Sequence, residues 1–373
     1  MGRHGVLGVC VVCLAAGAVW LLPASAGEKT TRPASGPSEW KVPLKHYDYL
    51  AGLSAGAEGR LVCLSGVHAP PPIKSAPPPG GPFCWLLDTT SGKTTDVMKH
   101  LADKAKIKGQ SVEPAIPSPD GKHLALVAMT DTGRPPSKIL AYVVDLTSGA
   151  VRKLYEGSGV QMAWCGPHLM VCTGDAKGQI EALKRVDPAT GKAEALKVHC
   201  FLGGADPKGT YLVCGCLPDA LDKPFTLPEL GSKGALALLS PGGKILRKVA
   251  PLSELSRMPV ISRGGKYLAF GREKSENPRR PPKPLGFRVI SADGKVSRDV
   301  PGHLDPVGVT DAGDVIARVV PTRPDAKPAI KWFGADGKQR TLVPDARSAA
   351  VCGSRLFYVT AGKQPMLKCI PLK

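Results

Sequence analysis

The chain has 373 residues and a formal net charge of +19, with 50 basic residues against 31 acidic ones. Hydrophobic residues make up 43% of the chain, so enough apolar surface is available for a core. Glycine (43) and proline (37) are abundant, but they follow no three-residue period. The composition therefore excludes a collagen-like fold and indicates a globular protein with many turns and loops.

The N-terminal segment has the three parts of a secretory signal. Arg3 supplies a positive charge, Val6–Leu22 is an apolar run of 17 residues, and Ala24-Ser25-Ala26 fits the rule for a cleavage site. An uncleaved membrane anchor is the alternative, but the run is short for a membrane span and the small residues favour cleavage. We predict an exported protein, periplasmic or extracellular, with no stable membrane span after cleavage. The expected segments are a signal peptide at 1–26, a flexible linker at 27–38 and a single domain at 39–373.

Residues 112–155 predict one complete unit of four antiparallel strands. "SPDG" at 118–121 is turn chemistry, because proline presets φ, aspartate bonds its own backbone and glycine accepts a positive φ. "TSG" at 147–149 marks a second turn. The expected strands lie at 112–116, 123–129, 139–146 and 151–155. Four strands in about 44 residues is the size of one β-propeller blade.

The same two turns recur along the chain. The glycine of the first turn is repeated at Gly59, Gly121, Gly166, Gly209, Gly265, Gly313 and Gly353. The second turn recurs at 88–93, 145–150, 187–192, 240–244, 292–295 and 335–338. The chain ends after a third strand, and "WKVPL" at 40–44 precedes the first unit without a blade of its own. We therefore predict an all-β, seven-bladed β-propeller whose last blade is completed by the N-terminal strand, which removes exposed sheet edges. Six or eight blades, or a pair of open β-sandwiches, are the alternatives.

Two stretches of the chain resemble a known family. "PSPDGKHLALVAM" at 117–129, continued by "ILAYVVDLTSGAVRKL" at 139–154, resembles the TolB-type propeller repeat, which is related in architecture to WD-type repeats. "SRGGKYLAFGRE", which opens the stretch 262–295, is the next best copy. The resemblance implies a β-propeller fold. TolB itself has an α/β domain ahead of its propeller, whereas the predicted ring begins soon after the cleavage site here, so we expect no role in the Tol–Pal envelope machinery.

The connections between second and third strands are the most unusual part of the sequence. They are long and proline-rich, at 66–82, 130–138, 216–233, 272–286 and 320–328. Strand alternation places all of them on one face of the ring. We predict an anion-binding face there, because guanidinium groups suit carboxylate, sulfate or phosphate partners and rigid proline segments lose little entropy on binding. A solvated rim that discourages aggregation is the alternative. The predicted binding residues are Arg134, Arg279, Arg280, Lys283, Arg323 and Lys327.

These features favour an exported, monomeric, non-enzymatic binding scaffold. Its proline-rich basic face would meet a protein, an anionic polysaccharide or another envelope component, and export argues against specific nucleic-acid binding. One alternative is a hydrolase or lyase that uses the central channel, and another is a structural interaction module of an envelope assembly.

The sequence lacks several motifs that mark enzymes and metal sites, which also favours a non-enzymatic protein. The chain contains no Walker loop and no H-E-x-x-H, and no α/β stretch of catalytic-domain length is left over, so we expect no cofactor and no metal. "HYD" at 46–48 and "HLD" at 303–305 place a histidine two residues before an aspartate on one face of a strand. We expect these pairs and His199 on innermost strands, where local hydrogen bonds are the commoner explanation and a metal or catalytic site is the alternative.

Nine cysteines follow the predicted signal peptide, and export makes disulfide bonds possible. Cys63 and Cys84 lie on neighbouring predicted strands of the first blade. Cys200 and Cys214 are expected to lie opposite each other across a hairpin centred near Pro207. The two pairs are candidate disulfides, each worth about 2–4 kcal/mol. The alternative is that these cysteines are free thiols that pack as small hydrophobic side chains.

Overall fold

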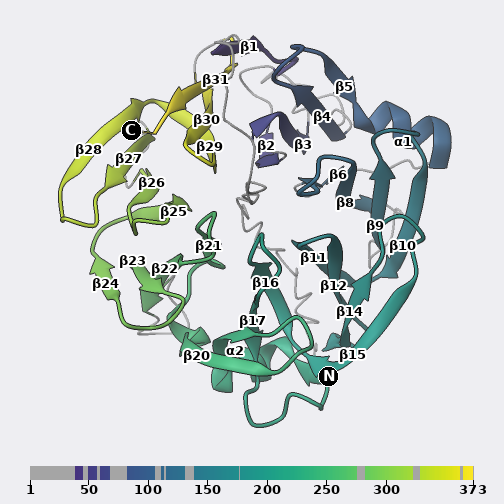
Figure 1. Ribbon diagram of the computed structural model, residues 1–373, viewed down its shortest axis with the longest axis vertical. Helices are drawn as coiled ribbons and strands as arrows, with labels where there is room; N and C mark the ends of the chain where they lie inside the picture. The colour runs from purple at the N-terminus through teal and green to yellow at the C-terminus, as the bar shows by residue number, and fades with distance from the viewer. Residues whose placement is uncertain are drawn as a thin grey trace, which may run out of the picture.

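The chain forms a ring of seven antiparallel sheets arranged around a central axis (Figure 1). The computed structural model describes residues 38–44, 49–56, 59–67, 82–105, 111–112, 115–130, 138–175, 177–274, 282–321, 328–361 and 364–372. Each sheet has a core of four strands, so the fold is a seven-bladed β-propeller and the predicted fold class is confirmed. The predicted signal peptide lies outside the described residues, and so does the predicted linker up to residue 37.

The first four blades follow one another in chain order, and the first strand of each lies nearest the axis (Figure 1). Blade 1 contains β2 (Tyr49–Gly56), β3 (Leu61–Val67), β4 (Pro82–Asp88) and β5 (Thr94–Asp96). Blade 2 contains β6 (Ser111–Val112), β7 (Ile116–Pro117), β8 (His123–Thr130), β9 (Lys138–Asp145) and β10 (Val151–Gly157). Blade 3 contains β11 (Gly159–Cys165), β12 (His168–Gly174), β14 (Ala182–Val186) and β15 (Ala193–His199). Blade 4 contains β16 (Phe201–Ala205), β17 (Leu212–Cys216), β19 (Ala235–Leu239) and β20 (Ile245–Pro251).

The remaining blades repeat this order, and short helical elements lie in the connections between some strands. Blade 5 contains β21 (Val260–Ile261), β22 (Tyr267–Lys274), β23 (Lys283–Ser291) and β24 (Ser297–Val300). Blade 6 contains β25 (Leu304–Val309), β26 (Val315–Val319), β27 (Ala329–Phe333) and β28 (Gln339–Pro344). Blade 7 contains β29 (Ala346–Cys352), β30 (Arg355–Thr360), β31 (Met366–Pro371) and, from the other end of the chain, β1 (Glu39–Lys41). The connecting elements are the helix α1 (Val97–Ala105), the helix α2 (Leu227–Lys233) and the 3-10 helix η2 (Leu252–Glu254). The short strands β13 (Gln179–Ile180) and β18 (Phe225–Thr226) pair with each other, which ties the long connection of blade 4 to blade 3.

The predicted turn glycines all adopt the backbone conformation that the turns require. The seven glycines between first and second strands have φ between 57° and 84°. Six more, Gly92, Gly149, Gly191, Gly243, Gly294 and Gly337, close the turns between third and fourth strands with φ between 70° and 89°. Residues with a Cβ rarely adopt these angles, so the glycine pattern fixed both turn positions in the sequence.

A short polar side chain opens each of several turns and bonds across it. Ser118 accepts a hydrogen bond from the amide of His123 at 2.9 Å and donates to Asp120 at 2.6 Å. Ser262 accepts from the amide of Tyr267 at 3.0 Å in the corresponding turn of blade 5. Such side chains replace part of the strand ladder where the backbone bends away, which is why serine, threonine and aspartate occur at these positions.

The core lies between the blades rather than inside any one of them. Each of the five clusters of buried hydrophobic residues contains side chains from at least two neighbouring blades. Phe287 of blade 5 meets Phe333 of blade 6 edge to face, with ring centroids 5.4 Å apart. Trp164 of blade 3 donates its indole N–H to the carbonyl oxygen of Ile116 in blade 2 at 2.9 Å. A single blade therefore has no core of its own, and the ring folds as a unit.

The two ends of the chain meet in blade 7. β1 pairs with β31 in antiparallel register, with Trp40 opposite Leu367. The Trp40 side chain is 8% exposed and packs near Phe357 of β30, with ring centroids 6.3 Å apart. On the other side of β1, Glu39 accepts a hydrogen bond from Lys368 at 2.6 Å. The predicted closure of the ring by the N-terminal strand is confirmed.

We expect Trp40→Ala to lower the free energy of unfolding by about 3–5 kcal/mol, because it removes a buried aromatic side chain and leaves a cavity in the clasp. Glu39→Ala is the matched control in the same strand. Its side chain is exposed, and exposed ion pairs contribute little to stability. Urea unfolding followed by tryptophan fluorescence and circular dichroism measures both variants. Equal small effects would show that the clasp contributes nothing to the stability of the ring.

Candidate functional site

The long connections leave from one face of the ring, which we call the connection face. It is the face on which the second strand of each blade ends and the third strand begins. The flanking strand ends are Val67 and Pro82, Thr130 and Lys138, Gly174 and Ala182, Cys216 and Ala235, Lys274 and Lys283, Val319 and Ala329, and Thr360 and Met366. The opposite face carries the short turns and is called the turn face.

One predicted binding residue is described by the structure. Lys283 opens β23 and its side chain is exposed. The other five, Arg134, Arg279, Arg280, Arg323 and Lys327, lie outside the described residues. The strands that flank Arg134 belong to blade 2, whereas those that flank the other residues belong to the adjacent blades 5 and 6. The connections that contain the predicted set therefore belong to blade 2 and to blades 5 and 6.

Ion pairs gather at the connection-face ends of blades 5 and 6. Arg272 donates to Asp299 at 2.7 Å and to Glu254 at 3.0 Å. Arg288 donates to the same Asp299 through two nitrogens, at 2.7 and 2.9 Å. The hydrogen bond from Arg288, reinforced by the charges of both arginines, holds the pKa of Asp299 below its ordinary value despite partial burial. The carboxylates thus fix the orientation of two guanidinium groups.

A second pair of arginines shares Asp305 at the start of blade 6. Asp305 is 6% exposed and accepts hydrogen bonds or ion pairs at 2.8 Å from Arg257 and from Arg318. The Arg257 side chain remains 43% exposed, so Asp305 holds one end of a guanidinium that still faces solvent. The aspartate of "HLD" is therefore buried and bonds to arginines from other segments of the chain, which is not the local contact expected from the sequence. His46 and Asp48 lie outside the described residues.

The turn face contains a cavity of about 690 Å³ where blades 2, 3 and 4 meet. It is built from the first turns of three consecutive blades and the second turn of blade 3. The lining residues are Ser118, Pro119, Asp120, His123, Trp164, Gly166, Pro167, His168, Asp187, Pro188, Pro207 and Lys208. We call it the turn cavity.

The residue two positions after the turn glycine differs between blades 2 and 3, where it lines the turn cavity, and the two blades that follow them. In blade 4 this residue is Tyr211, whose hydroxyl donates to the carbonyl oxygen of Gly265 in the next turn at 2.8 Å. In blade 5 it is Tyr267, whose ring lies 3.2 Å from where a Cβ on Gly313 would be. In blades 2 and 3 the position holds His123 and His168, and both line the cavity. The tyrosines reach the next turn, whereas the shorter histidines leave the space open.

The titratable groups of the turn cavity come from different blades. Burial alone would raise the pKa of Asp120, but hydrogen bonds from Ser118 and from the Lys122 amide hold it below its ordinary value. The Thr190 hydroxyl and the Ala189 amide hold the pKa of Asp187 low in the same way. Both carboxylates are therefore ionised at neutral pH. The cavity combines two carboxylates, two imidazoles and the ammonium group of Lys208 around a partly apolar space.

The sequence repeats contain a signal for the two cavity histidines that the sequence analysis did not identify. Gly121 and Gly166 are each followed two residues later by histidine, and Gly209 and Gly265 by tyrosine. Superposing the repeats on their turn glycines would have placed the two histidines in neighbouring positions of the ring. They are 45 residues apart in the chain, so a search for local ligand spacing did not relate them.

The structure places His199 away from the central axis. His199 is the last residue of β15, the outermost strand of blade 3, and not part of an innermost strand as predicted. Its imidazole hydrogen-bonds to the carbonyl oxygen of Ile180 at 2.8 Å, because the chain crosses the sheet edge before β16 begins. Within the described ranges, no helix is long and apolar enough to cross a membrane, and no group of three or more His, Cys, Asp or Glu could hold a metal ion.

"GLSAG" at 52–56 matches the G-x-S-x-G pattern of hydrolase nucleophiles, which the sequence interpretation overlooked. Ser54 lies within β2, is buried, and donates its hydroxyl hydrogen to the carbonyl oxygen of Ala115 in the next blade at 2.5 Å. A nucleophile of this class sits instead on a sharp turn between a strand and a helix. Ser54 is therefore an interblade contact.

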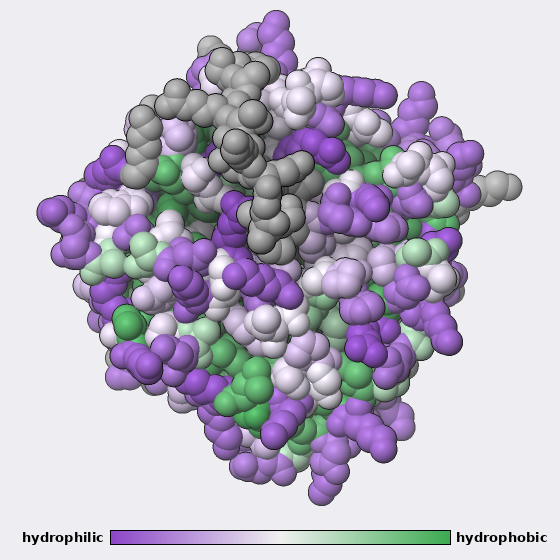
Figure 2. All heavy atoms as spheres, in the orientation of Figure 1, coloured by the Kyte–Doolittle hydropathy of each residue, from purple (hydrophilic) through white to green (hydrophobic). Residues whose placement is uncertain are grey.

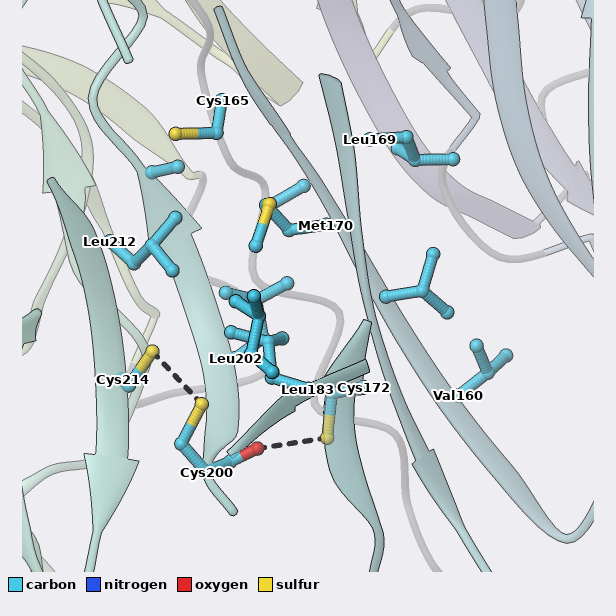
Figure 3. Close-up of a cluster of buried hydrophobic side chains, with 14 of the residues drawn as sticks. Val160, Cys165, Leu169, Met170, Cys172, Leu183, Cys200, Leu202, Leu212 and Cys214 are labelled. Carbon is cyan, nitrogen blue, oxygen red and sulfur yellow. Dashed lines mark hydrogen bonds between the residues drawn. The ribbon is translucent and has the colours of Figure 1, made fainter. Parts of the chain in front are cut away.

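Both predicted cysteine pairs are brought together, although no bond joins them in the structure. The sulfur atoms of Cys63 and Cys84 lie 3.5 Å apart, and those of Cys200 and Cys214 lie 3.3 Å apart (Figure 3). All four side chains are buried. Cys352 and Cys369 lie on β29 and β31, which are separated by β30.

The structure is similar to solved β-propellers. The propeller domain of the Trilobed protease from Pyrococcus furiosus matches with a TM-score of 0.57 and 12% identity, over 88% of this chain and 97% of that one. An oligogalacturonate lyase in complex with manganese matches with a TM-score of 0.50 and 14% identity, over 86% and 88% of the two chains. TolB from Acinetobacter baumannii matches with a TM-score of 0.46 and 13% identity, over 78% of this chain and 65% of that one.

No protein-family model matches the chain, and no curated protein matches it in sequence. Identities of 12% to 14% relate these proteins through their fold alone. The Trilobed protease domain and the lyase, whose TM-scores are 0.50 or higher, support the β-propeller fold. The Trilobed protease domain is described as having an open velcro topology, whereas β1 and β31 close the ring in this chain.

We expect Asp305→Ala to lower the free energy of unfolding by roughly 2–3 kcal/mol, because two guanidinium groups lose a buried acceptor while remaining partly hydrated. Asp219→Ala is the control, since Asp219 is 94% exposed and lies 3.5 Å from Lys248. Chemical denaturation of both variants measures the difference. If Asp305→Ala is as stable as Asp219→Ala, the arginines at this end of blade 6 are not held by Asp305.

Proposed function

We propose that this protein is an exported, monomeric and non-enzymatic β-propeller that binds an anionic polysaccharide of its surroundings through the connection face of blades 5 and 6. The segment 1–26 supports export. A protein partner with an acidic surface and a structural role within an envelope assembly are the alternatives if the protein binds no anionic polymer.

The observation that carries the proposal is the excess of fixed cationic groups at this position. Among the residues that the structure describes, the ion pairs of Arg257, Arg272, Arg288 and Arg318 involve three carboxylates, Glu254, Asp299 and Asp305. Lys283 adds a further exposed cation at the start of β23. The connection that ends there contributes Arg279 and Arg280 to the same stretch of sequence.

Preorganised guanidinium groups favour an anionic partner for a physical reason. Much of the cost of binding comes from ordering flexible side chains, and carboxylates that already hold the arginines reduce that cost. The planar guanidinium group also matches carboxylate and sulfate oxygens with two parallel hydrogen bonds. On the side of the ring seen in Figure 2, hydrophilic side chains project along much of the outer rim, with hydrophobic residues between them.

We expect Arg279→Glu/Arg280→Glu/Lys283→Glu to weaken binding to polygalacturonate or heparin roughly 10- to 100-fold, since three rim charges contribute about 0.5–1 kcal/mol each. The wild type should bind these polymers and not neutral dextran. Its affinity should fall steeply as salt rises, because exposed charges are screened. Surface plasmon resonance on immobilised polymer measures the affinity at several salt concentrations.

Lys244→Glu/Lys295→Glu/Lys338→Glu is the matched control. It reverses the same number of charges in blades 4, 5 and 6 but at exposed turns of the turn face. Retained affinity in this control, together with loss in the first variant, supports recognition by the connection face. Equal loss in both would indicate attraction by net charge alone, and no binding by the wild type would contradict an anionic polysaccharide partner.

A second candidate function is favoured by the turn cavity. The sequence left open a hydrolase or lyase with its site in the central channel, whereas the cavity that combines imidazole and carboxylate groups of neighbouring blades lies on the turn face. Imidazole and carboxylate groups in one cavity are suited to general acid–base chemistry or to holding a small polar ligand.

His168→Tyr tests the turn cavity directly. We expect this variant to fold as well as the wild type, because tyrosine occupies the corresponding position in blades 4 and 5, and to narrow the cavity at its His168 wall. A small molecule that raises the melting temperature of the wild type but not of His168→Tyr would bind in the cavity. Screening both proteins by thermal shift against a library of small polar metabolites makes this comparison. A ligand that stabilises both equally binds elsewhere.

A further inference from the structure

Four buried cysteines form two sulfur–sulfur contacts in different blades. Cys63 and Cys84 lie on β3 and β4 of blade 1, and their Sγ atoms are 3.5 Å apart. Cys200 immediately precedes β16 in blade 4, and its Sγ lies 3.3 Å from that of Cys214 on β17 (Figure 3). In each contact the two cysteines come from adjacent antiparallel strands, so closing the bond needs a shift of about 1.3–1.5 Å between sulfur atoms.

The two contacts have the same geometry. Cys63 is opposite Leu86, which follows Cys84 by two residues on β4. Cys214 is opposite Leu202, which follows Cys200 by two residues. Each pair is therefore a diagonal pair across two neighbouring strands with an offset of two residues, so both side chains lie on one face of the sheet. The same arrangement in two blades of unrelated local sequence argues against a chance contact.

Two other thiols, those of Cys172 and Cys216, lie near the Cys200–Cys214 contact but are arranged differently. Their arrangement favours the pairing of Cys200 with Cys214. Cys172 of β12 donates its S–H to the carbonyl oxygen of Cys200 at 2.9 Å, so it meets the backbone and not the sulfur pair (Figure 3). Cys216 lies two residues beyond Cys214 on the same strand. In the part of the chain that the structure describes, no cysteine group has the arrangement of a metal site.

We propose that Cys63–Cys84 and Cys200–Cys214 each become a disulfide bond when the chain folds under oxidising conditions. With glutathione disulfide as the oxidant, one cysteine thiolate attacks a sulfur of the glutathione disulfide and releases one glutathione. The second cysteine then displaces the other glutathione from the mixed disulfide. Two S–H bonds are replaced by one S–S bond, and two glutathione thiols carry away the two electrons and two protons.

The folded protein should resist this reaction, so the bonds form before the blades close. The contact with Cys63, followed by burial, raises the pKa of Cys84 well above its ordinary value. The contact with Cys214, followed by burial, does the same for Cys200. Because the thiolate is the reacting species, a folded chain with reduced cysteines exchanges slowly.

Each bond would join strands close to the point where a long connection begins or ends. Cys84 lies two residues after the start of β4, and Cys214 lies two residues before the end of β17. The connections at these strand ends are those of blades 1 and 4, which are long and rich in proline. The bonds would therefore hold the strand ends of the connection face together, independently of what that face binds.

The experiment compares full-length protein refolded in a glutathione redox buffer with protein kept fully reduced. Both samples are unfolded in guanidinium chloride and alkylated, and their masses are measured. We expect four fewer alkylated cysteines in the oxidised sample. Peptide mapping without reductant should give the linked pairs Cys63–Cys84 and Cys200–Cys214. Adding the same redox buffer to folded, reduced protein should give these bonds at least tenfold more slowly.

Single variants distinguish the two bonds from other oxidation. In Cys63→Ala and in Cys200→Ala, the oxidised and reduced samples should differ by two alkylated cysteines instead of four. Cys63→Ala should lose the Cys63–Cys84 peptide, and Cys200→Ala the Cys200–Cys214 peptide. Cys165→Ala, which removes another buried thiol of blade 3, should leave the difference at four. Equal alkylation of oxidised and reduced wild type would overturn the proposal, as would linked peptides that join other cysteines, such as Cys172 to Cys200. Because mapping uses the wild type, an unstable variant does not affect the result.

Discussion

The pairing of β1 with β31 is the constraint on which the other features of the structure depend. A propeller blade buries each face against a neighbouring blade, so an open ring would leave the facing surfaces of blades 1 and 7 exposed. The hydrophobic cluster that includes Trp40, Leu53 and Val351 joins blades 7, 1 and 6 at this point. A strand from one end of the chain in the sheet of the other end holds this junction closed, and it also covers the outer edge of β31.

Most of the fold could be predicted because its turns are specified locally. Glycines at positive φ and the side chains that open the turns, such as Ser118, depend on a few adjacent residues, and these survive in repeats whose strands have diverged. The count of seven first turns and six second turns then required a strand from elsewhere to complete the last blade. The ends of strands were harder to predict from the sequence. In blade 2, the two short strands β6 and β7 are found where the pattern predicted one strand at 112–116.

The candidate sites were harder to predict because their residues meet through the ring. Asp305, Arg257 and Arg318 come from three different segments, and each looks like an ordinary surface charge in the sequence. His123 and His168 are related only by their equivalent positions in successive repeats. Cysteine pairing was the exception. Adjacent strands of one blade are close in the chain, so hairpin geometry was enough to bring Cys200 near Cys214.

The two faces of the ring differ in how much their segments can change in length and charge without disturbing the fold. This difference determines what kind of site each face can carry. On the turn face, backbones of neighbouring blades touch: a Cβ on Gly209 would lie 3.1 Å from the amide nitrogen of Gly166. An insertion there would separate blades 3 and 4 and open the core. On the connection face the long segments begin where the strands end, so their length and charge can change while the turns and interblade contacts keep the ring intact. A large cationic surface is therefore compatible with the fold on the connection face, whereas a site on the turn face has to fit among the close contacts between neighbouring turns.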